Sequence, residues 1–255
     1  MDELSTVRRH YAQSVCGGLI HADRLIDAYA KVAREDFLLP PPWGVIINLP
    51  GRRGQVHMTS DPKDLYHDRL VQLDPTQRIN NGQPSLWAAA FDRLLLHEPR
   101  TLLHLGCGSG YYTAILAALV PATQLYFYDT VERLQAHALR AFDANDAVEP
   151  DDQVSAVDAV VCSFGRSLID AKLLQRWRDG GVLMTPLTDS QGRGFFIEMT
   201  RHGDAVDIRA LFGCAFILDA QQATFPDRVV WRDTLRTRLP ASGPLDFGAL
   251  FAPAD

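Results

Sequence analysis

The stretch Leu102-Leu103-His104-Leu105-Gly106-Cys107-Gly108-Ser109-Gly110-Tyr111-Tyr112-Thr113-Ala114-Ile115-Leu116 decides the fold. A short apolar strand is followed by three glycines at alternate positions and then by apolar residues at helical spacing. Glycine permits positive φ and lets the backbone approach a ligand, while the first N–H groups of the following helix face the same space. The stretch therefore predicts a strand, a tight loop and a helix that together bind a nucleotide-type cofactor.

One acidic residue supports this interpretation. Asp129 ends the apolar run 125–128 and follows Gly110 by 19 positions. In nucleotide-binding α/β units, an acid about 20 residues after the glycine loop reaches a ribose hydroxyl. The alternative, in which the glycines only form a tight strand-to-helix turn, stays open at this point.

The glycine spacing separates two classes of cofactor. A dinucleotide fold has G-x-G-x-x-G around a pyrophosphate, whereas this chain has G-x-G-x-G followed by the bulky Tyr111 and Tyr112. The pattern counts against a nicotinamide-dependent oxidoreductase and resembles the first motif of class I S-adenosylmethionine-dependent methyltransferases. That resemblance implies S-adenosyl-L-methionine as cofactor and the following binding residues: His104, Gly106, Cys107, Gly108, Ser109, Gly110 and Asp129.

Composition narrows the class of protein. The chain has 255 residues, 47% of them hydrophobic, which is enough for a sizeable core. Its net charge is -6 and its basic residues form no cluster larger than a short pair, so we expect no nucleic-acid partner. The cysteines stand far apart without a C-x-x-C pair, which predicts neither a metal site nor disulfides: Cys16, Cys107, Cys162 and Cys214. The acidic N-terminus and the lack of a long apolar run predict a cytoplasmic protein that does not enter a membrane.

Strand-like and helical segments alternate after the glycine loop. We expect strands at 125–128, 157–162 and 181–185, with helices over 131–142 and 168–177 between them, which predicts a mostly parallel sheet. The runs 195–199 and 206–209, joined by a turn at 202–204, predict a closing antiparallel pair.

The N-terminal part has a different character. Helical spacing around Gly17-Gly18 predicts two helices, and 85–97 predicts a third just before the glycine strand. The segment 39–64 is rich in Pro and Gly and predicts loop or linker, with a short strand at Val45-Ile46-Ile47; it is either a lid over the acceptor or an inert connection. We therefore expect an N-terminal region at 1–64, a catalytic domain at 65–225 and an extension at 226–255.

Four segments, taken together, resemble the protein-L-isoaspartate O-methyltransferase family. Val32-Ala33-Arg34-Glu35-Asp36-Phe37 is similar to a helix-ending signature, and Asn81-Gly82-Gln83-Pro84-Ser85 to the substrate-side loop. Leu103–Tyr112 is the cofactor motif, and the fourth segment runs from Val157 to Leu183. The resemblance covers roughly residues 25 to 220 and rests on the order and spacing of the motifs.

This resemblance implies a Rossmann-like three-layer α/β sandwich and methyl transfer to a carboxylate of a protein or peptide. A carboxylate is already ionised near neutral pH, so alignment of the two reactants dominates the rate. The oligomeric state is not implied. The acceptor-side candidates are Asn81 and Ser85 as catalytic residues, and Tyr66, His67, Gln83 and Ser163 as substrate-binding residues.

Two departures from the family pattern stand out. Gly82 occupies the place of a family serine that contacts the reacting carboxylate; Ser85, Asn80 or Asn81 could substitute, or the glycine simply serves a tight turn. Only 28 residues separate Asp129 from Asp158, too few for every element of a full methyltransferase, and 143–155 is polar. We therefore expect the third strand to be missing or vestigial.

Several residues have two interpretations. His104 stands where this class usually has an acid, and it either contacts the cofactor or is a buried strand histidine. Tyr66 and His67 either line the acceptor site or anchor a loop, and we favour the anchor. Because the departures touch both cofactor and acceptor sides, the alternative to an active enzyme is a catalytically degenerate binding or assembly protein that keeps the fold.

Overall fold

The computed structural model describes residues 3–49, 52–76, 78–120, 123–142, 148–151, 153–219, 229, 234–240 and 243–246. They fall into two compact units that interleave along the chain. The first comprises Met1–Glu98, Cys107–Thr123 and Asp129–Glu149; the second comprises Pro99–Gly106, Gln124–Tyr128 and Pro150–Asp255. The expected division at 64 and 225 stays a prediction. No helix among the described residues is long and apolar enough to span a membrane.

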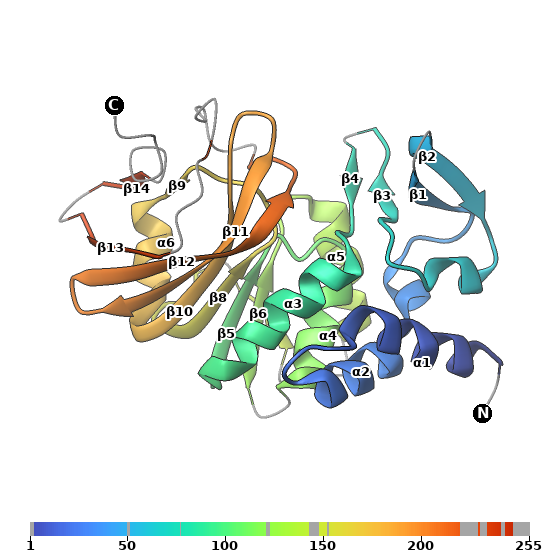
Figure 1. The fold of residues 1–255 in the computed structure, drawn as a ribbon, viewed down its shortest axis with the longest axis horizontal. Helices are drawn as coiled ribbons and strands as arrows, with labels where there is room; N and C mark the ends of the chain where they lie inside the picture. The colour runs from blue at the N-terminus through green and yellow to red at the C-terminus, as the bar shows by residue number, and fades with distance from the viewer. Residues whose placement is uncertain are drawn as a thin grey trace. The chain divides into compact units, whose positions relative to one another are not determined.

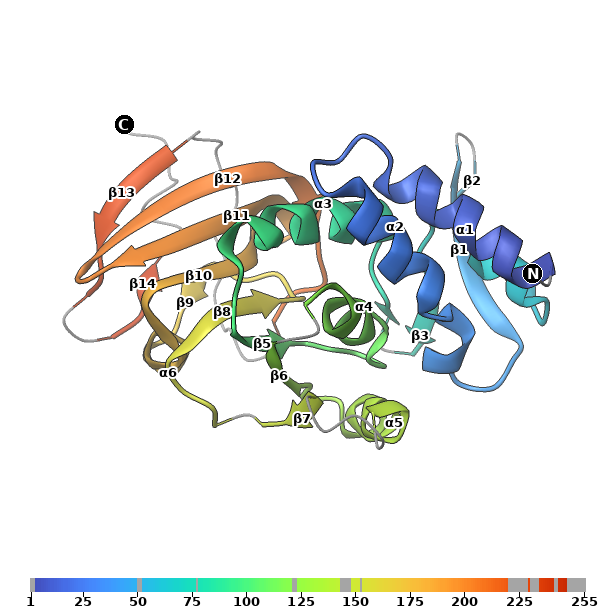
Figure 2. The same cartoon turned by 90° about the horizontal axis from the view of Figure 1, so that it is seen from below.

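Helices dominate the first unit. They are α1 (Glu3–Cys16), α2 (Ala22–Lys31), α3 (Pro84–Leu94), α4 (Tyr111–Leu119) and α5 (Glu132–Phe142), with short 3₁₀ turns at Arg34–Phe37, Pro62–Leu65 and Leu95–His97. The predicted N-terminal pair α1 and α2 lies side by side (Figure 2). Tyr11 and Val15 of α1, and Leu25 and Tyr29 of α2, are buried at helical spacing, which explains the pairing.

Aromatic rings fill the core of this unit around a buried cation. The Tyr11 ring lies 6.2 Å from Tyr29 and 5.5 Å from Tyr66, centroid to centroid. The Arg34 side chain, fully buried, lies over the Tyr111 ring at 5.7 Å. Rings stabilise a buried guanidinium through their negative faces, so the aromatic core and the arginine support each other.

The Pro- and Gly-rich segment is more regular than its composition predicts. Strands β1 (Trp43–Leu49) and β2 (Arg52–Thr59) form an antiparallel hairpin, so the expectation of loop or linker over 39–64 was wrong for most of it. The predicted short strand 45–47 lies within β1. Cross-strand pairing of β-branched residues, such as Ile46 with Val56, explains why this composition still forms strands. Two shorter strands, β3 (Gln72–Asp74) and β4 (Ile79–Asn80), follow.

A twisted sheet forms the second unit (Figure 1). Its order is β13-β12-β11-β10-β8-β5-β6-β7, from strands β5 (Thr101–Leu105), β6 (Gln124–Tyr128), β7 (Val148–Pro150), β8 (Val157–Cys162), β10 (Trp177–Thr188), β11 (Arg193–His202), β12 (Ala205–Ala215) and β13 (Thr234–Arg238). β6, β5, β8 and β10 run parallel, as predicted. β11 and β12 form the predicted antiparallel pair, and β13 adds to it.

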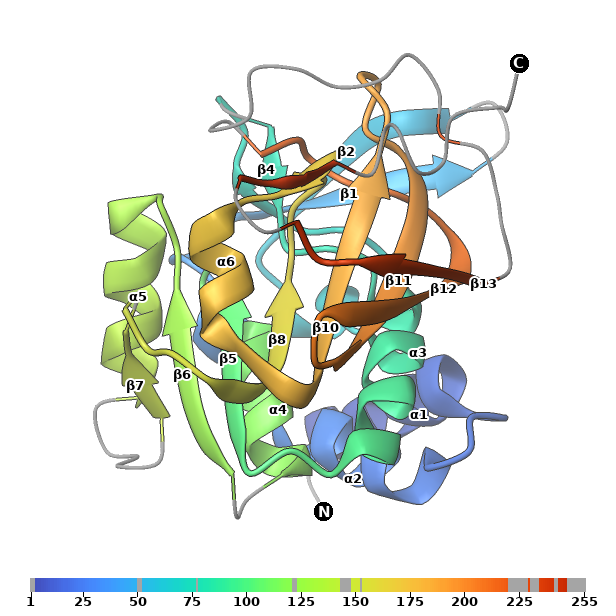
Figure 3. The same ribbon diagram turned by 90° about the vertical axis from the view of Figure 1, so that its left-hand side faces the viewer.

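Helix α6 (Ala171–Arg176) of the second unit packs on this sheet (Figure 3). It buries Leu173 among sheet residues such as Leu103 and Val160. The helix is shorter than the predicted 168–177, because Leu168–Ile169 forms β9, which pairs with β14 (Leu245–Asp246), and Trp177 begins β10. Each such fully buried large apolar side chain stabilises the fold by about 1.5–3 kcal/mol.

The expected loss of the third strand is confirmed in its vestigial form. After α5, the only strand before β8 in the described residues is β7, three residues long, at the end of the sheet order beside β6. Residues 143–147 and 152 of the polar stretch lie outside the described residues.

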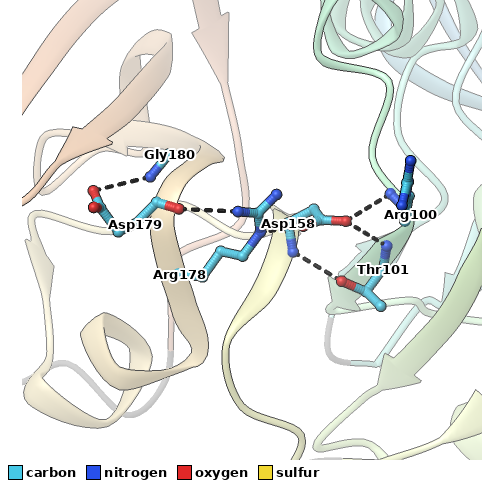
Figure 4. A network of polar contacts seen from close by, with 6 residues as sticks. All are labelled: Arg100, Thr101, Asp158, Arg178, Asp179 and Gly180. Atoms are coloured by element: carbon cyan, nitrogen blue, oxygen red, sulfur yellow. Dashed lines mark hydrogen bonds and ion pairs between the residues drawn. The ribbon is translucent and has the colours of Figure 1, made fainter.

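Near the start of β8, Asp158 fixes the register of β5 and β8 relative to each other (Figure 4). Its carboxylate accepts hydrogen bonds from the backbone N–H of Arg100 (2.7 Å) and Thr101 (2.9 Å), and it also pairs with Arg178. The Asp158 N–H donates to Thr101 Oγ1 at 3.0 Å. These contacts hold β5, and thus the start of the glycine loop, in a fixed position along the sheet.

Candidate functional site

In the first unit the glycine loop leads directly into α4. Gly108 and Gly110 have φ of +58° and +96°, in the left-handed region that glycine tolerates. A Cβ at Gly108 would lie 3.2 Å from Leu73 Cδ1, and one at Gly110 would lie 3.0 Å from Ala138 Cβ. Backbone conformation and close packing therefore explain part of the glycine pattern, in agreement with the tight-turn alternative. The close approach of a ligand to this loop stays a prediction.

Asp129 closes this loop from one side. Its Oδ2 accepts a hydrogen bond from the Gly108 N–H at 2.7 Å, and its Oδ1 accepts one from the Val131 N–H at 2.8 Å. Its own N–H donates to Gln135 Oε1 at 3.0 Å. Burial raises the pKa of the Asp129 carboxyl above its usual range, although the two backbone donors partly offset this. The acid is thus held in one orientation against the loop.

The geometry of Asp129 fits a ribose-binding role. An ionised carboxylate has about four acceptor positions, and the two backbone donors described above leave capacity for hydroxyl donors. The side chain is half-buried rather than enclosed. The Ser109 hydroxyl, buried in the same loop, has no hydrogen-bond partner among the described residues. Loop and acid are therefore compatible with the S-adenosylmethionine that the motif implies.

Cys107 has no sign of reactivity. The side chain is buried, and burial raises the pKa of its thiol well above the ordinary value. A thiol that stays protonated near neutral pH is a poor nucleophile. Any contribution of Cys107 to cofactor binding would come from its backbone.

The remaining cofactor candidates lie in the second unit. Gly106 has φ of +78°, and a Cβ there would lie 2.6 Å from the Phe164 ring. His104 is buried, and its Nε2 lies 2.7 Å from the Ser163 hydroxyl. Burial lowers the pKa of His104 to about 3, so the imidazole is neutral at physiological pH. His104 and Ser163 are thus direct partners, which supports the interpretation of His104 as a satisfied strand histidine.

The acceptor-side loop is tied to the cofactor helix within the first unit. The Tyr112 hydroxyl, from the first turn of α4, donates to the Gly82 carbonyl at 3.1 Å. Trp87 of α3 lies against the Tyr112 ring, with centroids 5.2 Å apart. Gly82 has φ of +77°, and a Cβ there would lie 2.5 Å from Trp87 Nε1. The indole therefore excludes a side chain at the position of the family serine.

Ser85 and Gln83 converge on a third side chain, Asp68. The Ser85 N–H and hydroxyl donate to the Asp68 carboxylate at 2.8 and 2.7 Å, and Gln83 Nε2 donates to it at 2.8 Å. A carboxylate at the N-terminus of a helix is favourable because the first N–H groups lack intrahelical partners. The loop thus holds a carboxylate of its own at the start of α3.

Asn81 is held by a buried arginine. Its Oδ1 accepts hydrogen bonds from the Val71 N–H at 2.9 Å and from Arg34 Nη2 at 3.2 Å. Arg34 also donates to the backbone carbonyls of Leu65 (2.6 Å) and Arg69 (2.8 Å). The Asn81 Nδ2 is buried without a partner among the described residues. Asn81 therefore carries a fixed donor that its surroundings leave unused.

Tyr66 and His67 differ in exposure. The Tyr66 hydroxyl is buried and contacts Arg8 Nε at 2.8 Å, the Arg34 N–H at 3.1 Å and the Glu35 carboxylate. These contacts favour the anchor interpretation of Tyr66. His67 is exposed, and its carbonyl accepts from Arg34 Nη1 at 3.3 Å. Substrate roles for both stay predictions.

The structure divides the candidates into two groups. Asn81, Gln83 and Ser85 share one loop, whereas His104 and Ser163 form a separate pair in the second unit. Sequence reasoning missed Arg34 and Asp68 as organising residues. Arg34 lies in the helix-ending signature, so the sequence did mark this residue. Asp68 lies 17 residues before Ser85, and no pattern in the sequence indicates their contact.

These features define a class of protein: a Rossmann-like methyltransferase with parallel strands, a glycine loop and an acid at the end of the second strand. Two solved structures of this fold agree. A protein-L-isoaspartate O-methyltransferase from Plasmodium falciparum, in complex with S-adenosyl-L-homocysteine, aligns over 87% of this chain and 99% of its own, with TM-score 0.62 and 15% identity. Another protein-L-isoaspartate O-methyltransferase aligns over 86% of this chain and 66% of its own, with TM-score 0.65 and 15% identity.

Sequence comparison assigns the family. The profile of the protein-L-isoaspartate(D-aspartate) O-methyltransferase family matches residues 52–223, and the chain belongs to this family. The protein-L-isoaspartate O-methyltransferase of Shewanella halifaxensis is 31% identical over 149 residues, which cover 54% of this chain and 68% of that protein. The corresponding enzyme of Vibrio atlanticus is 30% identical over 149 residues, covering 54% and 69%. The family predicted from the motifs is confirmed.

Proposed function

We propose that this chain transfers a methyl group from S-adenosylmethionine to a carboxylate of a protein or peptide, as an isoaspartyl-type carboxyl O-methyltransferase. Family membership supports the reaction class. The observation that carries the proposal is the hydrogen bond from Tyr112 to Gly82, because it joins the cofactor helix to the acceptor-side loop within one unit. Proximity of the two reactants is the main requirement of this chemistry.

The cofactor supplies a methyl group bound to a sulfonium sulfur. When the methyl group is transferred, the sulfur becomes a neutral thioether. An acceptor carboxylate has a pKa of about 4 and is ionised near neutral pH, so the protein needs no general base. We assign cofactor binding to the loop Gly106–Gly110 and to Asp129, and a contribution of His104 stays a prediction. The task of the acceptor-side loop is then to hold the carboxylate oxygen in line with the methyl group.

Donors for that carboxylate are unequally available. The Asn81 Nδ2 donor is unused among the described residues, which is why we assign Asn81 as the main contact; because this atom is buried, the carboxylate would reach it only after the loop opens. Ser85 and Gln83 donate to Asp68, so an acceptor carboxylate would have to exchange with Asp68 before these donors could bind it. Tyr66, His67 and Ser163 complete the proposed substrate set, at lower priority because of the contacts described above.

The same proposal places the protein in the cytoplasm, with a polypeptide rather than a nucleic acid as its partner. The net charge of -6 and the dispersed cysteines support this location and this partner.

The test is methyl transfer from radiolabelled S-adenosylmethionine to matched peptides that contain isoaspartate, aspartate or asparagine at one position. We expect label in the isoaspartyl peptide, released as methanol by mild base, because a carboxyl methyl ester is base-labile. No label in any peptide, or label that survives base, would contradict carboxyl methylation. Asn81→Ala should reduce transfer without weakening S-adenosylhomocysteine binding.

A further inference from the structure

The hairpin β1–β2 carries an exposed strand with no role in the site described above. Val56 and Met58 of β2 are 41% and 55% exposed, and both lie on one face because strand residues alternate. In the register of the hairpin they stand opposite Ile46 and Gly44 of β1. The result is a small apolar strip along a strand that pairs, among the described residues, with β1 alone.

The part of β2 that carries Val56 and Met58 lacks most of the features that protect an edge strand. Proteins block such edges with proline, with charged side chains, with bulges or by covering them, because unpaired backbone groups can pair with another chain. The two arginines of β2 and the break in its register with β1 lie at the start of the strand, whereas Gln55–Thr59 pairs regularly with Trp43–Ile47 and contains His57, no proline and no acidic residue. His57 Nε2 lies 3.5 Å from the Asp64 carboxylate, which flanks the strand. The strand is therefore basic and apolar, and it complements an extended acidic polypeptide.

The hairpin is connected to the acceptor-side loop through one short segment. The Ile46 N–H donates to the Leu70 carbonyl at 2.8 Å, and Val45 forms an isolated bridge with Val71. Val71 exchanges hydrogen bonds with Asn81: the Val71 N–H donates to Asn81 Oδ1 at 2.9 Å, and the Asn81 N–H donates to the Val71 carbonyl at 3.0 Å. A polypeptide bound at the hairpin would thus lie on the same framework that holds Asn81.

We propose that the free edge of β2 binds an extended acidic segment of the acceptor polypeptide as an added strand, at a distance from the methylated residue. Backbone hydrogen bonds of an added strand provide affinity, and the Val56–Met58 strip provides contact for alternate side chains. The proposal rests on the proposed function for the nature of its ligand. It assigns this hairpin the role of selecting polypeptides that are longer than the methylated site itself.

The experiment compares two isoaspartyl peptides with the same central sequence. The short peptide ends near the isoaspartate. The long peptide adds an extended acidic segment and is made in two versions, one with the segment before the isoaspartate and one with the segment after it. We expect a KM for one long version about tenfold below that of the short peptide, with similar kcat. Val56→Asp with Met58→Asp should remove that advantage and leave short-peptide kinetics within about twofold.

Leu96→Asp is the matched control, because Leu96 is an exposed apolar residue (45%) outside the hairpin. It should leave both peptides unchanged. Equal KM values for long and short peptides, or equal effects of the hairpin and control variants, would overturn the proposal. So would a dimer in sedimentation that the hairpin variant dissociates, since a second copy would then occupy the edge.

Direct binding separates this inference from the proposed function. Fluorescence polarisation of the labelled long peptide, with S-adenosylhomocysteine present, reports binding even if no peptide is methylated. Tight binding that the hairpin variant weakens, without methylation, would support the edge site and contradict the proposed reaction. Methylation of the short peptide without any effect of peptide length would support the proposed reaction and contradict the edge site.

Discussion

Residues Cys107–Gly110 of the glycine loop and the acceptor-side loop Asn80–Ser85 belong to the same unit but differ in how they match the expected family pattern. The glycine loop keeps its glycines and has Asp129 hydrogen-bonded to it at 2.7 Å. The acceptor-side loop has Gly82 where the resemblance implies a serine, with the Trp87 indole where that side chain would stand. The glycine loop therefore matches the expected pattern, whereas the acceptor-side loop is organised around Trp87 and an internal carboxylate, Asp68.

This difference separates two requirements of methyl transfer. Cofactor binding depends on a backbone shape that few sequences satisfy, so its loop tolerates little change. Acceptor binding needs only well-placed hydrogen-bond donors, which several residues can supply.

Restoring the family serine should damage the protein rather than improve it. Gly82→Ser forces a side chain into φ of +77° and against Trp87 Nε1 at 2.5 Å. Positive φ and overpacking each cost about 1–3 kcal/mol, so we expect the free energy of unfolding to fall by about 2–6 kcal/mol in a urea titration.

The matched control for this substitution is Gly18→Ser. Gly18 also has positive φ (+86°), but a Cβ there meets nothing within 4 Å. The control should therefore lose only the contribution from backbone conformation, about 1–3 kcal/mol. Equal losses at the two positions would show that Trp87 does not determine the identity of residue 82.

On the cofactor side, Asp129→Asn should weaken S-adenosylhomocysteine binding by about 10- to 100-fold, because hydrogen bonds to a charged group contribute about 1.5–3 kcal/mol. Calorimetry measures this, with Glu132→Gln, an exposed acid in the first turn of α5, as the control. Because burial raises the pKa of Asp129, wild-type affinity should weaken as pH falls through that raised value. Unchanged affinity in Asp129→Asn would refute the ribose-binding role.

His104 makes stability depend on pH. Its pKa is about 3 in the folded protein and about 6.5 when unfolded, so the unfolded state binds more protons between these values. Stability should therefore fall as pH drops below about 6.5, by about 2 kcal/mol at pH 5. His104→Asn should remove this slope, and Ser163→Ala, which keeps the buried imidazole, should retain it. Denaturant titrations at pH 7 and pH 5 measure both.

The smallest effect concerns the link between the two loops. Tyr112→Phe removes the hydrogen bond to the Gly82 carbonyl and should cost about 1 kcal/mol of unfolding free energy. It should also raise KM for the peptide acceptor while leaving S-adenosylhomocysteine affinity nearly unchanged. Tyr111→Phe, whose hydroxyl contacts Tyr11 at 3.3 Å instead, should not change KM. An equal rise in KM in Tyr111→Phe would mean that the Tyr112–Gly82 hydrogen bond acts only through general stability.

Features encoded by local spacing were predictable from the sequence. The strand, loop and helix around Gly106–Gly110, the helix after Asp129 and the antiparallel pair β11–β12 all follow short-range patterns. The shortness of β7 followed from chain length alone, because too few residues separate Asp129 from Asp158.

Features that depend on tertiary contacts were not predictable. The hairpin β1–β2 was hidden by its Pro- and Gly-rich surroundings. The contacts of Arg34 with the carbonyls of Leu65 and Arg69 span more than 30 residues and leave no periodicity in the sequence. The exclusion of a serine at Gly82 depends on Trp87, five residues further on in α3, and no sequence pattern reveals that contact.

The most direct test of the central claim is methyl transfer to the isoaspartyl peptide, read by mass spectrometry before and after mild base. We expect a single added methyl group on the isoaspartyl residue, lost on base treatment and absent from the aspartyl and asparaginyl controls. If the protein binds S-adenosylhomocysteine in calorimetry but methylates none of the peptides, the claim of isoaspartyl methylation is contradicted.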